Sequence, residues 1–116
     1  MLIRNFLMSP LQDAAKIHDG CGIAKHVSLF DNKDFSTNLR FINYTILPSG
    51  VSIGSHKHGD DEELYIILEG NGEMTVNGEV RSVTAGDIIV NPPFGSHELV
   101  NNSDSDLKIL VMEVFK

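Results

Sequence analysis

The residues best suited to chemistry lie in the middle of the chain, in the stretch GVSIGSHKHGDDEELYIILEG that begins at Gly50. His56 and His58 are two residues apart, so in an extended strand both imidazoles leave the same face and can converge on one ion. Glu63 opens the next apolar run and adds a carboxylate. Imidazoles suit Zn, Cu, Fe and Ni, and a carboxylate widens the choice toward Mn. The pattern indicates a metal site, although a lone HxH beside an acidic turn also fits a solvated surface.

These side chains must be positioned by β-strands, because the chain after about residue 27 is a series of short apolar or β-branched runs bounded by Gly, Pro, Asn and Asp. The expected strands cover residues 27–30, 39–47, 63–68, 72–76, 79–83, 87–91, 97–101 and 107–115. Asn77-Gly78 predicts a type I′ hairpin between two of them. So many short strands cannot form one flat sheet without a bare face, so we expect an all-β barrel or a two-sheet sandwich.

One segment near the N-terminus has helix signals. Ser9 could cap a short helix, Pro10 suits its first position and Gly20 could end it. No linker-like or low-complexity stretch divides the chain. We therefore expect an N-terminal extension over residues 1–26 and one barrel domain over residues 27–116.

The spacing of the candidate ligands resembles the cupin superfamily, and the chain looks like a small single-domain member. The first motif of that family is a glycine, five residues, HxH, three or four residues, a glutamate, six residues and a glycine. This chain fills it with Gly50, His56, His58, Glu63 and Gly70. The second motif is matched by Gly86, Pro92, His97 and Asn101, with Phe94 standing where the family has a glycine.

The resemblance implies a jelly-roll barrel that binds one divalent metal ion, of which Mn, Fe, Zn and Ni are the candidates, through His56, His58, Glu63 and His97. Four protein ligands on a six-coordinate ion leave two open positions, which a structural metal site lacks. Nearby acids are expected to favour the protonated forms of His56 and His58. The substrate pocket is expected to include Tyr65, Phe94 and Phe41.

Several functions are compatible with this scaffold, and no catalytic residue can be assigned. The first hypothesis is a metalloenzyme of the dioxygenase, decarboxylase or isomerase type that acts on a small oxygen-bearing metabolite. The alternative is a non-catalytic module that binds or senses a sugar or an organic acid. Away from the motifs, His18, Cys21 and His26 match no common metal site.

Composition limits the partners. The 16 acidic and 9 basic residues give a net charge of −7, the wrong sign for a nucleic acid or an anionic membrane surface. A single cysteine excludes an internal disulfide and favours a cytoplasmic location. We expect a small-molecule ligand and a homodimer, because the apolar residues near the N-terminus lie outside both motifs: Leu2, Ile3, Phe6, Leu7, Met8 and Leu11.

Overall fold

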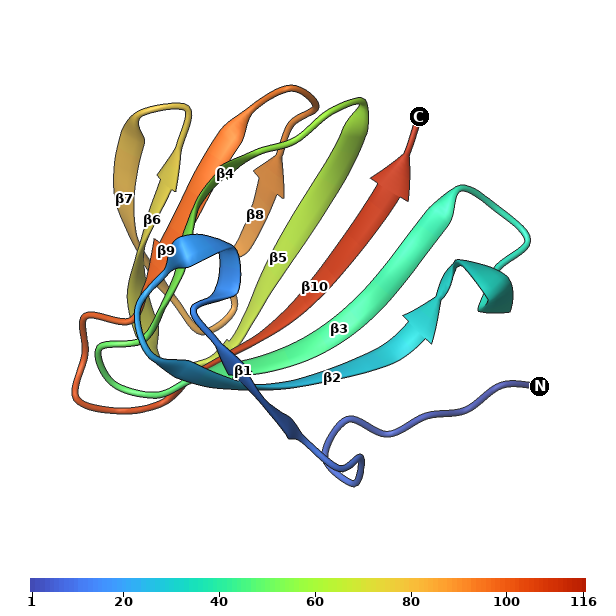
Figure 1. Ribbon diagram of the computed structural model, residues 1–116, viewed down its shortest axis with the longest axis horizontal. Helices are drawn as coiled ribbons and strands as arrows, with labels where there is room; N and C mark the ends of the chain where they lie inside the picture. Colours follow the sequence, from blue (N-terminus) through green and yellow to red (C-terminus); the bar gives the residue numbers. More distant parts are fainter.

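The computed structural model describes residues 1–116 as two antiparallel β-sheets that pack face to face (Figure 1). The six-stranded sheet contains, in spatial order, β1 (Gln12–Ala15), β2 (Ile23–Asp31), β3 (Leu39–Leu47), β10 (Leu107–Phe115), β5 (Asp61–Glu69) and β8 (Ile88–Asn91). The four-stranded sheet contains β4 (Ser52–Lys57), β9 (Ser96–Val100), β6 (Asn71–Val76) and β7 (Glu79–Thr84). The predicted all-β jelly roll is confirmed. None of the helical segments has the length and hydropathy of a membrane-spanning helix.

The core lies between the two sheets and follows the period-two alternation of the strands. In β10, Leu107, Ile109 and Val111 are buried on the inner face, while the residues between them are partly exposed. Twelve buried apolar residues from both sheets form one cluster. Since this cluster contains no histidine, burial of apolar surface can hold the sheets together without an ion.

The Asn77-Gly78 hairpin is confirmed. It joins β6 to β7, and both residues have positive φ, 48° at Asn77 and 82° at Gly78, as a type I′ turn requires.

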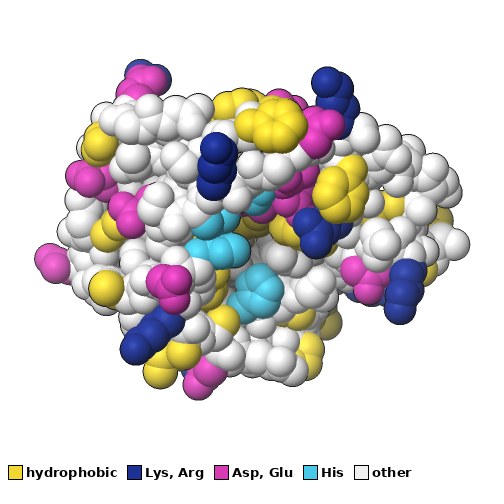
Figure 2. Space-filling model, turned by 45° about the horizontal axis from the view of Figure 1, so that its top comes forward, with side chains coloured by type: hydrophobic (Ala, Val, Ile, Leu, Met, Phe, Trp, Pro, Cys, Tyr) yellow, Lys and Arg dark blue, Asp and Glu magenta, His cyan; other side chains and the backbone are white.

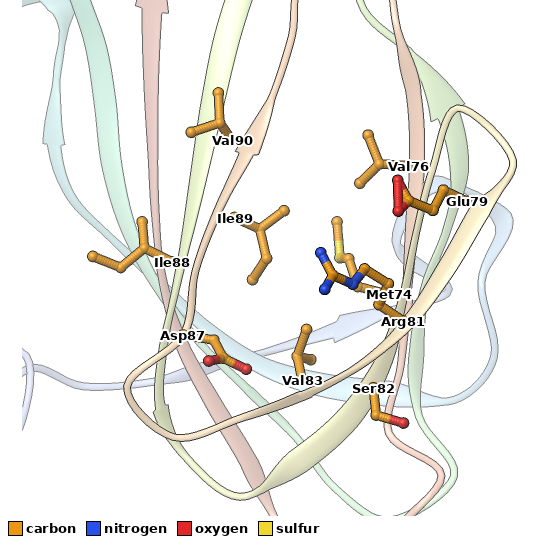
Figure 3. Close-up of a pocket in the computed structure, with 10 residues that line it drawn as sticks. All are labelled: Met74, Val76, Glu79, Arg81, Ser82, Val83, Asp87, Ile88, Ile89 and Val90. Carbon is orange, nitrogen blue, oxygen red and sulfur yellow. The ribbon is translucent and has the colours of Figure 1, made fainter.

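The edge strand β7 of one sheet does not pair with the edge strand β8 of the other, and a cavity of about 560 Å³ lies between them. Figure 3 shows Met74, Val76 and Ile89 beside this space, with Arg81 reaching in from β7. No histidine lines it.

The predicted N-terminal helix is wrong. Residues 12–15 form β1, which pairs with β2 from Gln12 opposite His26 to Ala15 opposite Ile23. A strand that pairs with a long neighbour gains hydrogen-bond partners across the sheet, whereas a helix of only a few turns is marginal alone. β2 begins at Ile23, earlier than the expected start of the barrel domain at residue 27.

Residues 16–20, here called the strap, connect β1 to the turn before β2 and contain the 3₁₀ turn η1 (Ile17–Asp19). Lys16, His18 and Asp19 all have left-handed backbone, with φ of 50°, 50° and 61°, which is uncommon outside glycine. The strap lies directly on β4, because a Cβ atom added to Gly54 would meet the His18 carbonyl oxygen at 2.1 Å. This glycine therefore lets the strap approach β4 closely enough to bring His18 over it. The other 3₁₀ turn, η2 (Asn32–Asp34), lies between β2 and β3.

Candidate metal centre

The four residues expected to bind a metal come together at one end of the barrel. His56 on β4 and His97 on β9 are cross-strand partners in the smaller sheet, and Glu63 reaches them from β5 of the larger sheet. His58 follows directly after β4. One potential ligand atom from each residue lies within 4.8 Å of all the others. Figure 2 shows histidine side chains gathered in a hollow of the surface, with acidic side chains beside them.

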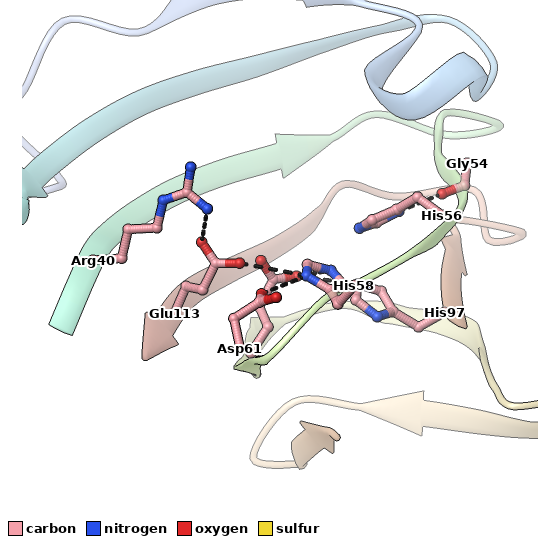
Figure 4. Close-up of polar contacts among 8 residues, drawn as sticks. Arg40, Gly54, His56, His58, Asp61, His97 and Glu113 are labelled. Carbon is pink, nitrogen blue, oxygen red and sulfur yellow. Dashed lines mark hydrogen bonds and ion pairs between the residues drawn. The ribbon is translucent and has the colours of Figure 1, made fainter. Parts of the chain in front are cut away.

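His56 is oriented by its own strand. Its Nδ1 lies 2.8 Å from the Gly54 carbonyl oxygen, which can only accept, so Nδ1 carries the proton and donates it (Figure 4). In the neutral ring, Nε2 then has a free lone pair. A backbone carbonyl in this role fixes both the tautomer and the ring angle of a metal-binding histidine.

His58 is held in the same way by a carboxylate. Its Nδ1 lies 2.6 Å from Asp61 Oδ2, which leaves Nε2 as the atom that points toward the other ligands. Nε2 is buried, has no hydrogen-bond partner and lies 3.6 Å from Glu63 Oε1. A buried nitrogen without a partner is costly, and a metal ion at this position would satisfy it.

Glu63 and His97 form the buried side of the centre. His97 Nε2 lies 3.0 Å from Glu63 Oε1, and both side chains are almost completely shielded from solvent. The Tyr65 ring meets the His97 ring edge to face at 5.2 Å. Burial, followed by the neighbouring Glu63 carboxylate, raises the pKa of Tyr65 well above its ordinary value, so its hydroxyl keeps a proton that it can donate to Glu63.

The spacing and chemistry of these atoms fit a divalent cation. Metal bonds of about 2.1 Å place neighbouring ligand atoms about 3 Å apart and opposite ones about 4.2 Å apart. The observed upper limit of 4.8 Å is close to these values. The donor set also matches the free Nε2 atoms of His56 and His58 described above. The residues present therefore could hold one ion of the Mn, Fe, Ni or Zn type.

A second layer of charged groups supports His58. Glu113 Oε1 lies 3.4 Å from His58 Nδ1, and Glu113 Oε2 accepts a hydrogen bond of 3.0 Å from Arg40 (Figure 4). Burial, followed by the hydrogen bond to Asp61, raises the pKa of Glu113 to about 8. At neutral pH a proton is therefore held between Glu113 and Asp61, and Asp61 faces His58 as the carboxylate. These carboxyl groups therefore hold the orientation of the His58 ring, whose Nε2 has no partner.

The expected protonation of His56 is wrong. Burial lowers the pKa of His56 to about 4, since the cost of desolvating an imidazolium exceeds the attraction of nearby acids. The neighbouring rings of His97, His18 and His58 add to this shift. His56 is consequently neutral at pH 7, the state that binds a metal ion.

A cavity of about 280 Å³ adjoins the centre on the inner face of the larger sheet. Its walls are Ala14, Ile17, His18, His26, Phe41, Asn43, Thr45, Ile53, Glu63, Tyr65 and Val111. The cavity thus includes two of the three residues expected in a substrate pocket, Tyr65 and Phe41. Phe94 does not line it: its ring is exposed, and its backbone has a φ of 60° with N–H donating to the Gly59 carbonyl oxygen. The residue that replaces the motif glycine therefore adopts a backbone conformation that glycine tolerates best.

The sequence did not predict a role for His18. The strap places its ring flat against His56, with centroids 3.6 Å apart and planes at 12°, at the border between the ligand cluster and the cavity. Burial lowers the pKa of His18. His26 also lines the cavity, with Nδ1 2.8 Å from the Thr45 hydroxyl, whereas Cys21 is exposed. The positions of His18, Cys21 and His26 in the sequence gave no indication that the strap folds over the end of the two sheets.

Two antiparallel sheets that enclose three histidines and a glutamate beside a small cavity define a jelly-roll protein with a potential metal centre. Residues 43–113 match the family profile described as Cupin domain. The chain therefore belongs to the cupin family.

Known proteins of this family resemble the chain to different extents. The oxalate-binding protein of Thermotoga maritima is 29% identical over 112 residues, which cover 97% of this chain and 92% of the relative. A crystal structure described as a predicted oxalate decarboxylase from Thermotoga maritima has a TM-score of 0.94 and 27% identity, with all of both chains covered. The 5-nitrosalicylic acid 1,2-dioxygenase of a Bradyrhizobium species is 33% identical over 72 residues, 62% of this chain but only 34% of that enzyme.

Proposed function

We propose that His56, His58, Glu63 and His97 hold one divalent metal ion and that the protein binds a small oxyacid at this ion. The observation that carries the proposal is the convergence of four ligand atoms, one of them the unpartnered His58 Nε2, beside a cavity. The ion would supply positive charge and two adjacent coordination positions for two oxygens of the acid.

The charge balance of the centre supports an anionic ligand. Three neutral imidazoles and one carboxylate contribute about −1 to a divalent ion, so the loaded centre keeps a charge of about +1. The chain as a whole carries −7, but those charges are dispersed and screened by solvent. At a few ångströms, in the poorly hydrated barrel, attraction by the ion prevails. The relative described as an oxalate-binding protein agrees with a small acid as ligand.

The other residues of the centre have supporting parts in this proposal. Asp61 fixes the tautomer of His58, and the buried Tyr65 hydroxyl keeps a proton that it can donate to Glu63. His18 covers the open side of His56 and keeps water from that ring. These contacts hold the ligand atoms in place before an ion arrives, which lowers the ordering cost of binding it.

Oxalate is expected to bind the metal-loaded protein about one to one and to show no measurable binding to the metal-free protein. Two adjacent oxygens can displace two waters from an ion at once, whereas the empty cluster offers no ion for the acid to chelate. Isothermal titration calorimetry on both forms tests this. Equal heats with and without metal would contradict the proposal.

Turnover of the bound acid is a second candidate, because His18 and His26 line the cavity and can hold or move a proton close to a ligand. Relatives described as dioxygenases are compatible with this candidate, although the chain covers only about a third of the Bradyrhizobium enzyme. Mass spectrometry of an oxyacid incubated in air with the Fe- or Mn-loaded protein decides between turnover and simple binding. An unchanged acid would leave binding as the function.

We also propose that the protein is a homodimer. The outer face of the six-stranded sheet carries adjacent apolar side chains from four strands: Ile42, Leu64, Ile66, Ile88, Val90, Leu110 and Met112. Phe6 packs against Tyr44 on the same face, with centroids 4.7 Å apart, while Leu2, Ile3, Leu7 and Met8 remain exposed. A second copy would cover this face and the N-terminal residues together.

Light scattering at micromolar concentration is expected to give twice the chain mass of 12.8 kDa. Replacing Ile66 and Leu110, which are neighbours on this face, with lysine is expected to shift the protein to the monomer, because a dimer would then have to bury two adjacent like charges from each chain. Glu79→Lys on the exposed edge strand β7 is the matched control and should leave the dimer intact. A wild-type mass near 12.8 kDa would contradict the dimer.

A further inference from the structure

The cavity between the edge strands β7 and β8 is separate from the metal centre. Its volume of about 560 Å³ lies within the range of ordinary ligand pockets, about 300–1,000 Å³. None of its ten lining residues belongs to the four candidate metal ligands or lines the smaller cavity beside them. A ligand held between β7 and β8 would therefore bind whether or not the centre holds an ion.

Part of the wall of this cavity is the apolar edge of the core. Met74 and Val76 come from β6, Val83 from β7 and Ile89 from β8. Met74 and Val83 belong to the buried core cluster, and Val76 and Ile89 pack against it. An apolar group of a ligand would extend the core at this edge and lose its contact with water.

Two side chains of opposite charge face the same space. Glu79 and Arg81 are two residues apart on β7, so both side chains leave the face of the strand that also carries the buried Val83. Arg81 is in register with Met74, and Glu79 with Val76. Figure 3 shows the Arg81 guanidinium in the middle of the cavity and the Glu79 carboxylate beside Val76. A polar ligand would thus meet a cation and an anion next to the apolar wall.

Both charges are free to pair with a ligand. Asp87, the other carboxylate of the cavity, accepts a hydrogen bond of 2.8 Å from the Thr84 backbone N–H, whereas Glu79 has no such partner. Arg81 has no acidic group within 4 Å, because the lysine and arginine side chains in ion pairs are all at other places in the structure: Arg4, Lys25, Arg40 and Lys108.

The separation of the two charges suits one class of ligand. Residues two apart on a strand lie about 7 Å from each other. An α-amino acid carries its ammonium and carboxylate groups on the same carbon atom, and a charge-assisted hydrogen bond of about 2.8 Å at each end lets them bridge roughly that gap. A fatty acid would pair with Arg81 alone and bring its negative charge close to Glu79 and Asp87. Charge complementarity therefore favours a zwitterion.

From these features we propose that the cavity between β7 and β8 binds a free α-amino acid with an apolar side chain. Arg81 pairs with its carboxylate, Glu79 pairs with its ammonium group, and the wall around Met74 and Val83 holds its side chain. This site is distinct from the proposed oxyacid site and needs no ion.

Four small molecules separate the parts of the inference. L-leucine carries both charges, 4-methylpentanoate lacks the ammonium group, 3-methylbutylamine lacks the carboxylate, and glycine lacks the apolar side chain. In NMR titrations of ¹⁵N-labelled protein, L-leucine should shift the amide signals of β7 and β8 and bind about tenfold more tightly than each of the other three.

A variant of the metal centre excludes the other place where an amino acid could bind. An amino acid can chelate a metal ion, so the titration is repeated with the variant that carries both His56→Ala and His58→Ala. L-leucine should bind this variant as tightly as the wild type, because neither histidine lines the cavity between β7 and β8.

Two substitutions in the cavity should have opposite selectivity. Arg81→Gln should weaken the binding of L-leucine and 4-methylpentanoate about tenfold and leave 3-methylbutylamine unchanged. Glu79→Gln should weaken the binding of L-leucine and 3-methylbutylamine about tenfold and should not weaken 4-methylpentanoate. Glu73→Gln changes an exposed glutamate of β6 outside the cavity and is the control that should leave all affinities as in the wild type. Circular dichroism monitors the fold of each variant.

Several results would overturn the inference. They are the absence of shifts in β7 and β8 with L-leucine, equal affinities for L-leucine and 4-methylpentanoate, an affinity for L-leucine that Arg81→Gln does not change, and loss of L-leucine binding in the variant without His56 and His58. Each of them would leave the proposed function intact, because that proposal is tested separately with oxalate and the metal-loaded protein.

Discussion

Replacing both His56 and His58 with alanine is expected to reduce the bound metal from about one divalent ion per chain to none while the barrel stays folded. The change removes two of the four ligand atoms, including the one left without a partner, and the remaining Glu63 and His97 are too few to retain the ion. The fold persists because the buried apolar cluster between the sheets contains neither residue. Elemental analysis and circular dichroism measure the two effects.

His26→Ala is the matched control for this experiment. His26 lies in the same barrel and lines the adjoining cavity, but it is not part of the four-residue cluster. The control should therefore keep its metal. Wild-type metal content in the double variant would show that the ion binds elsewhere and would remove the basis of the proposed function.

A large loss of stability is expected from Asn101→Ala. Asn101 is fully buried, and its Nδ2 donates to the carbonyl oxygens of Leu47 and Ser105, each at 2.7 Å. Its Oδ1 accepts from the backbone N–H and the hydroxyl of Ser103. Alanine would leave buried partners unsatisfied, and the free energy of unfolding should fall by about 3 kcal/mol.

Urea denaturation followed by circular dichroism measures the change in the free energy of unfolding. In thermal unfolding, Tm should fall by roughly 10 °C. Asn102→Ala removes the neighbouring, exposed amide and should change stability by less than about 0.5 kcal/mol. Equal stability of the two variants would show that the loop after β9 does not depend on the buried amide.

Much of the fold could be predicted because local signals agreed with the long-range pairing. Both β3 and β10 were expected with their observed bounds, since each is a long apolar run. The strand β4 was absent from the expected runs, because its glycine and serines weaken the strand pattern. The N-terminal segment was misassigned because capping residues near Ser9 indicate a helix only where no neighbouring strand competes for the backbone.

For the candidate site, the sequence indicated the ligand types but not their surroundings. HxH and Glu63 follow a local spacing, whereas the pairing of Asp61 with Glu113 depends on which strand lies beside β5. The one available signal for the role of Glu113 was its own position, since it is an acidic residue on the buried face of β10. The position of His18 depends on left-handed backbone at three residues of the strap, Lys16, His18 and Asp19, and the tolerance of histidine and aspartate for this conformation is too weak a signal to predict it.

The origin of the ligands in both sheets has a consequence for folding kinetics. His56 and His97 belong to the smaller sheet and Glu63 to the larger one, so the complete cluster forms only when the two sheets have docked. An ion that binds this cluster stabilises the native state and not the unfolded chain or a single sheet. Because the contact forms late, the ion should slow unfolding while leaving the folding rate almost unchanged. Metal would then lengthen the lifetime of the native state. At high protease concentration, where cleavage follows the unfolding rate, it would also increase the resistance of the protein to proteolysis.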